Sequence, residues 1–339
     1  MLDSQVRIYD QVHKYRRILS KADQTFALEI ECEGDHMSMP TREEHYWTVT
    51  HDPSLRGESC EYIMTTPRKL ESLDSVVRQW KRISDRSNIN FKSKRTSTHV
   101  HVNFQHKTLL QTFTACTAFW FLENLLLQFC DEARTANFFC LRLEDANERL
   151  DKILQVTQED APFDDLWNGQ YRYANLNLTA LMKFGSLEVR CMDGDATPSR
   201  LKVWVKTIFH ILENSKHFKD PTELLNFYSE NGAAALLDDL LPAEVSKYWK
   251  KTPRFEELID ENYSFLLLMS STTIPWVNEK QHPPPQNYPW EVNAEDMRAA
   301  PLQRFIRRRD EEQAEDEEEL ADWEEREPDE EEEEEEDAI

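Results

Sequence analysis

The chain has 339 residues, with 40 basic and 65 acidic side chains and a formal net charge of −25. This length can bury a large core, so one or two domains are expected. Residues 310–339 hold 21 acidic residues and one basic residue, which leaves a net charge of about −5 for residues 1–309. Basic patches are sparse, and a nucleic-acid partner is therefore not expected.

The C-terminal acidic segment is predicted to be disordered. It ends in a run of glutamates, and it cannot bury enough apolar surface to offset the entropy lost on ordering. Prolines at 275 and 283–285 separate it from the preceding helices. We expect a lead-in at 1–24, a folded domain at 25–272, a loose proline-containing segment at 273–309 and a disordered acidic tail at 310–339.

The cysteine pattern suits a reducing compartment, and the apolar pattern predicts no membrane span. The six cysteines form no Cys-x-x-Cys pair, which argues against a zinc ribbon or a disulfide scaffold. The N-terminus lacks a secretory signal pattern, and the apolar runs are too short or too interrupted to span a bilayer. A cytoplasmic protein without a membrane partner is expected. The six glycines match neither a P-loop nor a dinucleotide fingerprint.

The predicted elements mix strands and helices irregularly. Strands are expected where apolar and polar residues alternate, and helices where apolar residues recur every three or four positions. The expected strands are 25–33, 58–66, 97–105, 173–181 and 186–192, and the expected helices are 70–85, 109–130, 141–156 and 198–212, with further helices to about 270. This order predicts an α+β fold: a largely antiparallel sheet with a concave charged face and helices packed on the other side.

Three glutamates alternate in the first predicted strand, Phe26-Ala-Leu-Glu-Ile-Glu-Cys-Glu. Because strand side chains alternate between faces, Glu29, Glu31 and Glu33 should point one way, whereas Leu28 and Ile30 should point into a core. Like charges on one face repel each other unless a cation lies among them. A divalent metal with oxygen ligands is one interpretation, and a solvated strand face is the other.

Three more predicted strands carry polar groups on the face away from the core. They offer Glu61, then His99 and His101, then Glu188 and Arg190. Carboxylates with an imidazole suit Mg²⁺ or Mn²⁺. A guanidinium on the same face can bind phosphate or carboxylate through two hydrogen bonds. The alternative is a metal-dependent hydrolase that uses the pair of histidines and an activated water.

Five motifs in order resemble the amidoligase family, which comprises carboxylate–amine ligases of the glutamine synthetase and glutamate–cysteine ligase fold. The motifs are Ala27-Leu-Glu-Ile-Glu, Asp52-Pro-Ser-Leu followed by Glu61-Tyr-Ile-Met-Thr-Thr-Pro67, Thr98-His-Val-His-Val, Arg172-Tyr-Ala-Asn-Leu-Asn177 and Ser186-Leu-Glu-Val-Arg190. The resemblance covers roughly residues 25–215, within an amidoligase-like catalytic domain at 25–272. Ala27 replaces the opening glycine of the family strand, and Gly194 is not followed directly by the threonine that the family often has.

The resemblance implies roles for individual residues. The metal ligands would be Glu29, Glu31, Glu61, Glu188 and one imidazole, with His101 preferred, and the residues acting in catalysis would be Arg190, Glu188 and Glu61. Contacts to nucleotide or substrate would come from Asp52, Ser54, His99, Arg172, Asn175 and Asn177. Glu33 has no clear family role and is expected at the surface end of its strand.

The implied reaction uses ATP and Mg²⁺ (or Mn²⁺) to join a small-molecule or peptide carboxylate to an amine. ATP would convert the carboxylate into an acyl phosphate, and the amine would then displace phosphate. Metal and arginine charge would stabilise the phosphoryl transition state. Besides the hydrolase, a non-enzymatic interaction protein acting through its acidic tail stays open, although such tails are more often solubilising appendages.

Overall fold

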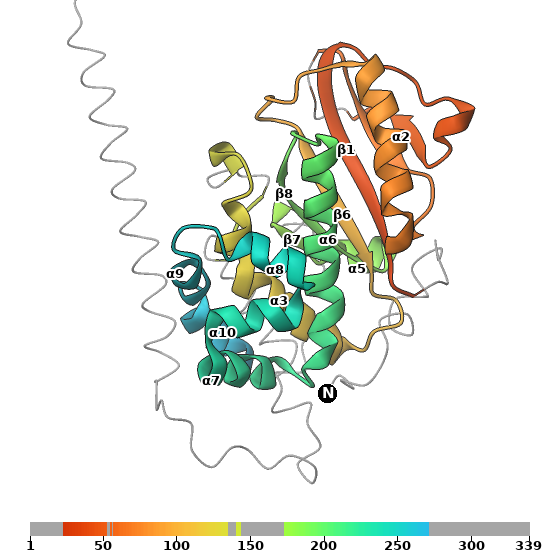
Figure 1. Cartoon of the computed structure of the whole chain (residues 1–339). Helices are drawn as coiled ribbons and strands as arrows, with labels where there is room; N and C mark the ends of the chain where they lie inside the picture. The colour runs from red at the N-terminus through yellow and green to blue at the C-terminus, as the bar shows by residue number, and fades with distance from the viewer. Residues whose placement is uncertain (1–22, 53–54, 56, 135–139, 144–172, 271–339) are drawn as a thin grey trace, which may run out of the picture. The chain divides into compact units, whose positions relative to one another are not determined.

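The computed structural model describes residues 23–52, 55, 57–134, 140–143 and 173–270 (Figure 1). Mixed helices and an open antiparallel sheet confirm the predicted α+β class. The predictions for residues 1–22, 273–309 and 310–339 lie outside the described residues. Most of the polar helix predicted at 141–156 lies outside them as well.

The described strands form one sheet in the order β2-β3-β1-β6-β8-β7, and the short strands β4 and β5 also pair with β1. Their bounds are β1 Thr25–His36, β2 Trp47–Thr50, β3 Ser59–Met64, β4 Arg68–Lys69, β5 Asn88–Ile89, β6 Ser97–Asn103, β7 Leu176–Asn177 and β8 Ser186–Asp193. All of these strand pairs are antiparallel. The four strands with predicted metal ligands, β3, β1, β6 and β8, are therefore consecutive in space although scattered along the chain.

The described α-helices are α2 Leu73–Arg86, α3 Leu109–Leu127, α5 Thr179–Phe184, α6 Pro198–Asn214, α7 Pro221–Leu240, α8 Ala243–Trp249, α9 Phe255–Asp260 and α10 Tyr263–Ser270. Helices α2 and α6 contact the apolar side chains of the sheet, α3 packs against α6, and α7, α9 and α10 pack against α3. A capping box between Thr108 and Gln111 begins α3. Every residue of α3 except Gln111 is buried, so this helix lies inside the protein.

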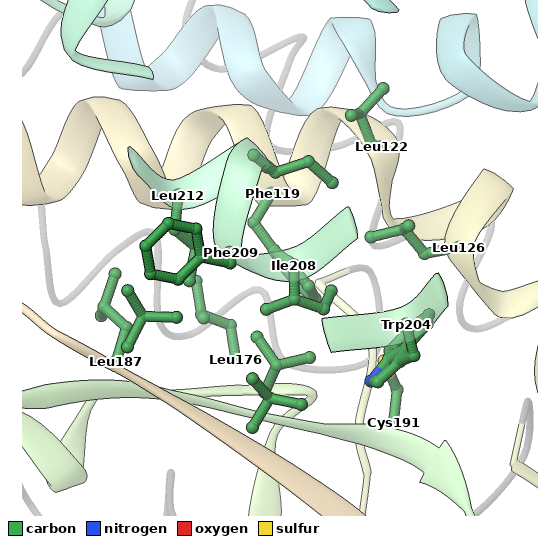
Figure 2. Close-up of a cluster of buried hydrophobic side chains, with 14 of the residues drawn as sticks. Phe119, Leu122, Leu126, Leu176, Leu187, Cys191, Trp204, Ile208, Phe209 and Leu212 are labelled. Atoms are coloured by element: carbon green, nitrogen blue, oxygen red, sulfur yellow. The ribbon is translucent and has the colours of Figure 1, made fainter. Parts of the chain in front are cut away.

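The core joins the helices to the strands that hold the polar groups. Trp204 and Ile208 of α6, together with Phe119 of α3, belong to one buried cluster with Leu187 and Cys191 of β8 (Figure 2). Each of these side chains is fully buried. Because alternate residues of β8 are anchored in this core, the opposite face of the strand is held in place as well.

Two of the predicted strands differ from their expected form. The strand expected at 97–105 is buried on both faces, because the polar face of β6 is covered by the charged groups of its neighbours. The strand expected at 173–181 is only two residues long, and α5 follows at once. The reason is local: Asn177 Oδ1 accepts hydrogen bonds from the backbone N–H of Thr179, at 2.9 Å, and from its hydroxyl, at 2.6 Å, which turns the chain into a helix.

Candidate metal centre

Neighbouring strands bring the predicted acidic groups and histidines to one face of the sheet. Residues directly opposite each other in an antiparallel pair project from the same face. The opposed pairs are Glu31 with Glu61, Glu29 with His99, and His101 with Glu188. Between Thr98 and Val100 the β6–β8 register shifts by one residue, so that Arg190 and Cys191 both lie opposite His99. Arg190 shares the polar face with Glu188, two residues before it, and Cys191 enters the core.

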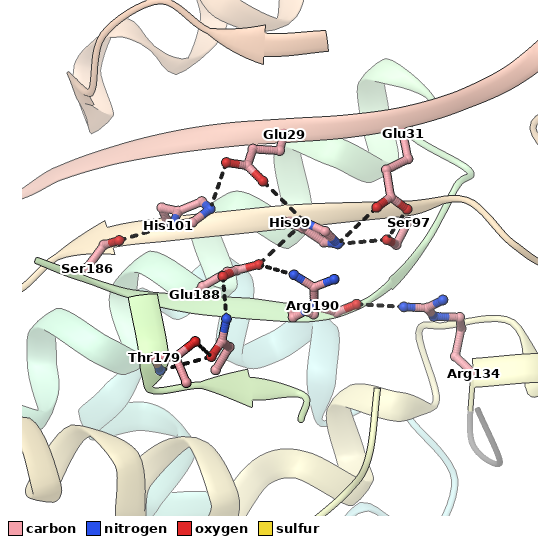
Figure 3. A network of polar contacts seen from close by, with 11 residues as sticks. Glu29, Glu31, Ser97, His99, His101, Arg134, Thr179, Ser186, Glu188 and Arg190 are labelled. Atoms are coloured by element: carbon pink, nitrogen blue, oxygen red, sulfur yellow. Dashed lines mark hydrogen bonds and ion pairs between the residues drawn. The ribbon is translucent and has the colours of Figure 1, made fainter. Parts of the chain in front are cut away.

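His99 lies at the centre of the group (Figure 3). Its Nδ1 is 3.4 Å from Glu29 Oε2 and 3.4 Å from Glu188 Oε1. Its Nε2 is 3.8 Å from Glu31 Oε1. Only 2% of the His99 side chain is exposed, so carboxylates from two strands surround a buried ring.

Ser97 determines which nitrogen of this ring carries hydrogen. Its Oγ lies 2.5 Å from Glu31 Oε2 and 2.7 Å from His99 Nε2. A carboxylate can only accept, so the serine hydroxyl donates to Glu31 and accepts from Nε2–H of His99. In the neutral ring, Nδ1 then holds the lone pair and faces Glu29 and Glu188. A nitrogen lone pair between two carboxylates suits a bound cation.

His101 occupies a different position. Its Nε2 is 3.3 Å from Glu29 Oε1, and its Nδ1 is 3.0 Å from the Ser186 hydroxyl. Burial would lower the pKa of His101, but Glu29 and Glu188 outweigh this effect and raise it. His101 therefore serves as a cationic partner of Glu29, and the geometry favours His99 over the predicted His101 as the nitrogen ligand.

The acidic residues do not all titrate alike. Burial raises the pKa of Glu29, but neighbouring positive charge, that of His101 above all, outweighs it and holds this pKa well below its usual range. Burial raises the pKa of Glu188 as well, but neighbouring positive charge, first that of His101 and then that of Arg190, outweighs burial and lowers this pKa. Both carboxylates are thus ionised at neutral pH and available to a cation.

Glu61 shows the opposite behaviour. Burial, and after it the charges of Glu29, Glu31 and Asp52, raises the pKa of Glu61 to about 8, although Arg190 opposes the rise. The negative charge of the site therefore exceeds what its own histidines and arginine balance. A site of this charge favours a proton on Glu61 and could hold a metal cation in its place.

Two groups of side chains within the described residues could hold a metal ion. One contains Glu29, His99 and Glu188, and the other contains Glu31, Glu61 and His99. The ligand atoms of each group lie within 4.8 Å of one another. Oxygen donors with one imidazole fit a hard divalent ion such as Mg²⁺ or Mn²⁺. Because Nε2 of His99 donates to Ser97, the second group offers oxygen ligands from Glu31 and Glu61 only.

Arg190 borders the first group. Its Nη1 donates to Glu188 Oε1 at 2.5 Å, and 19% of its side chain is exposed. Its buried Nε has no hydrogen-bond partner among the described residues. Arg134 is 2% exposed and donates through Nη2 to the carbonyl oxygen of Arg190 at 2.8 Å, which fixes the backbone there. Arg190 thus presents a held guanidinium with unused donor capacity beside the carboxylates.

The other predicted contacts divide into three kinds. Asn177 joins the site, because its Nδ2 donates to Glu188 Oε2 at 2.7 Å. Asp52 lies close enough to Glu61 to raise its pKa. Asn175 does not join the site: its Nδ2 donates to Glu123 Oε1 of α3 at 3.0 Å, and it faces the helices. Ser54 and Arg172 lie outside the described residues.

The structure also changes the expected position of Glu33. Its side chain is buried, not exposed, and it accepts hydrogen bonds from Ser93 at 2.7 Å and from Arg95 at 3.0 Å. Arg95 neutralises it locally, so Glu33 stands apart from both cation groups. Alternation placed it on the same face as Glu29 and Glu31, but the partner from the loop before β6 was not predictable from spacing.

Sequence reasoning missed the two serines that orient the histidines. Ser97 contacts His99, and Ser186 contacts His101. The signal was present for Ser97, because alternation puts residues 97, 99 and 101 on one strand face. What alternation cannot show is that the hydroxyl reaches the ring nitrogen and sets its tautomer.

None of the helices in the described part of the chain has the length and hydropathy that crossing a bilayer requires.

A comparison with curated protein sequences gave no match. A family profile described as "Putative amidoligase enzyme" matches residues 23–212, which is more than half of the chain. The matched span includes every strand of the sheet and both cation groups. This protein therefore belongs to the amidoligase family of ligase enzymes.

Proposed function

We propose that the protein is an ATP- and Mg²⁺-dependent carboxylate–amine ligase that forms an amide through an acyl phosphate. One observation carries the proposal. His99 belongs to both clusters of side chains that could hold a cation, and Arg190 lies beside them, bonded to Glu188. Cations and a guanidinium at one place are what phosphoryl transfer requires, because charge develops on the transferring oxygens.

The first step would join the substrate carboxylate to the γ-phosphoryl group of ATP and release ADP. A divalent cation held by Glu29, Nδ1 of His99 and Glu188 would supply positive charge to the phosphate oxygens. Arg190 would bind the same oxygens through N–H groups that Glu188 does not use. Asn177 and Ser97 would hold Glu188 and His99 in position.

The second step would bring the amine nitrogen to the acyl carbon, with cleavage of the C–O bond and departure of phosphate. The amine must lose a proton when the amide forms. Glu61 would take it, because a cation held by Glu29, His99 and Glu188 would favour the ionised form of this carboxyl, which can then accept a proton. Glu61 is also partly exposed, so the proton can leave to solvent.

A zinc hydrolase using both histidines has less support from the geometry. Such a site would need both imidazoles as ligands of one ion. In the described residues, both candidate groups contain His99 and neither contains His101. The acidic tail, on which the non-enzymatic alternative depends, lies outside the described residues.

Hydroxylamine tests the ligase proposal without knowledge of the natural amine, because it converts acyl phosphates into hydroxamates. The full chain is incubated with Mg²⁺, ATP, hydroxylamine and mixtures of carboxylic acids, and ADP and hydroxamate are measured. Glu188→Gln and Glu31→Gln should each lower acid-dependent ADP release about 100-fold or more. Glu43→Gln is the matched control, because Glu43 is 81% exposed and its ion pair among the described residues is with Arg82 at the surface. The proposal fails if the wild-type protein binds neither Mg²⁺ nor ATP.

A further inference from the structure

A pocket of about 390 Å³ opens beside the cation groups. Glu29 and His101 are among its lining residues and connect it to the metal centre. The rest of its described lining comes from the start of β1, the end of β3 with the residues after it, the end of β6, and the junction of α5 with β8. A ligand in this pocket would touch the metal centre directly.

The lining is almost free of charge. Glu29 and His101 are the only titratable residues in the described lining, which contains no lysine or arginine. Ala27, Ile63 and Phe184 are among the apolar members. Because the imidazole of His101 already faces Glu29, an anionic group elsewhere in this pocket would have no cation to pair with, whereas an uncharged chain would be well accommodated.

Two buried polar atoms of the described lining have no hydrogen-bond partner among the described residues: Nε2 of His101, which faces Glu29 at 3.3 Å, and Oε1 of Gln105. Gln105 is 3% exposed, and its Nε2 donates to the carbonyl oxygen of Phe184 at 3.2 Å. That bond identifies the other terminal atom as the oxygen. Oε1 has no hydrogen-bond partner among the described residues. A buried acceptor without a donor is unfavourable, so a ligand that supplies an N–H group would bind preferentially.

We propose, on the basis of the ligase activity proposed above, that this pocket binds the body of the acid substrate. The body is uncharged and largely apolar and carries an N–H group that donates to Gln105 Oε1, while the reacting carboxylate lies toward Glu29. The acid is the occupant because its oxygen must attack phosphorus at the cations, and the pocket begins at a residue of the first cation group.

A nucleobase is the competing occupant. With the base in this pocket and the γ-phosphoryl group at the cations, the intervening phosphates would pass Glu29 beside a described lining without lysine or arginine. The first two phosphates of a nucleotide normally meet lysine, arginine or backbone N–H groups. The lining therefore favours the acid.

Three acids of similar length, measured on the full chain with Mg²⁺ and ADP present, test the proposal. They are 4-acetamidobutyrate, which carries an N–H group, heptanoate, which lacks it, and adipate, which ends in a second carboxylate. Dissociation constants come from ligand-observed NMR. Wild-type protein should bind 4-acetamidobutyrate about tenfold more tightly than heptanoate. Adipate should bind more weakly than heptanoate.

Two variants and one control assign the effect to the pocket. Gln105→Met should abolish the preference for 4-acetamidobutyrate over heptanoate, and Ala27→Leu, which fills the pocket, should weaken both about tenfold or more. Gln128→Met makes the same chemical change at an exposed position on the C-cap of α3 and should change nothing. Thermal melts and Mg²⁺·ADP binding establish that each variant is folded.

The outcomes separate this inference from the proposed function. If Mg²⁺·ADP does not bind to the wild-type protein, the proposed function fails. If it binds normally, the pocket assignment is overturned by no saturable binding of 4-acetamidobutyrate, by equal binding of adipate, or by an unchanged preference in Gln105→Met. Displacement of 4-acetamidobutyrate by adenosine would assign the pocket to the nucleobase and overturn the inference as well.

Discussion

Ser97 lies 2.7 Å from Nε2 of His99, and this contact decides which face of the imidazole can bind a cation. The Ser97 hydroxyl donates its hydrogen bond to Glu31 and therefore accepts one from His99, which keeps the ring hydrogen on Nε2. The lone pair of Nδ1 is thereby directed toward Glu29 and Glu188. A serine that is not itself a candidate ligand thus orients the nitrogen toward the carboxylates of the first candidate group.

Removing this hydroxyl should weaken metal binding. Ser97→Ala frees the His99 ring to adopt the other tautomer, and we expect the affinity for Mn²⁺ to fall about 10- to 100-fold. Titration calorimetry measures the affinity, and ¹⁵N NMR of the metal-free protein reports the tautomer of His99. Ser186→Ala removes the matching hydroxyl from His101 and should leave the affinity within about threefold. A loss in Ser186→Ala but not in Ser97→Ala would contradict the assignment of His99.

The raised pKa of Glu61 predicts a pH-dependent stability of the metal-free protein. A carboxyl group whose pKa is about 8 in the folded state and near 4.3 in the unfolded state keeps its proton on folding. The free energy of unfolding therefore falls as the pH rises from about 4.3 to 8. Glu61→Gln should remove this fall, so the variant should gain stability over wild type at pH 9 but not at pH 4. Denaturant unfolding in EDTA measures both, and equal gains at the two pH values would contradict the prediction.

Metal binding should show the complementary pH dependence. A cation at the second group competes with the proton of Glu61, so the affinity for Mn²⁺ should rise as the pH increases from 6 to 9. Glu61→Gln should flatten this rise. The measurement is calorimetry in two buffers of different ionisation enthalpy, which counts the protons released. If Mn²⁺ binding to the wild-type protein releases no protons at pH 7, the metal does not displace the proton of Glu61, and the prediction is wrong.

The pair of Glu44 and Arg86 offers a stability test far from the site. Arg86 donates to both carboxylate oxygens, at 2.8 Å and 2.9 Å, and the Glu44 side chain is 2% exposed. Hydrogen bonds from Arg86 and then from Thr41 overcome burial and lower the pKa of Glu44 to about 2. The contribution of ionised Glu44 to the free energy of unfolding is therefore fully present above about pH 4.3, and it is lost as the pH falls toward 2.

Glu44→Gln should reduce the free energy of unfolding by about 1–3 kcal/mol at pH 7. The difference from wild type should disappear near pH 2. Glu43→Gln, at the neighbouring exposed position, should change stability by less than about 0.5 kcal/mol. Equal losses in the two variants would show that the burial of Glu44 contributes nothing.

The polar face of the sheet was predictable because strand alternation alone assigns it. Glu29 with Glu31, His99 with His101, and Glu188 with Arg190 each lie two residues apart, and the structure keeps each pair on one face. The choice between His99 and His101 was not predictable. It depends on the register of three strands and on a serine that reaches only one of the two rings.

Asn175 and the strand expected at 173–181 show a second limit. The family resemblance implies that Asn175 joins Asn177 at the site, but β7 contains only Leu176 and Asn177. Outside it, the Asn175 amide turns to Glu123, a buried acceptor on α3. Glu123 also accepts from the backbone N–H of Leu143. Such side-chain directions are determined by partners from distant segments, which local sequence patterns do not predict.

Crystals of the full chain grown with Mn²⁺ and ADP test the central claim most directly. Anomalous scattering locates manganese independently of any assumed chemistry. The account predicts manganese bound to Glu29, to Nδ1 of His99 and to Glu188, with the β-phosphate of ADP at the same ion and Arg190 beside it. Manganese bound elsewhere, or nucleotide bound away from these strands, would contradict it.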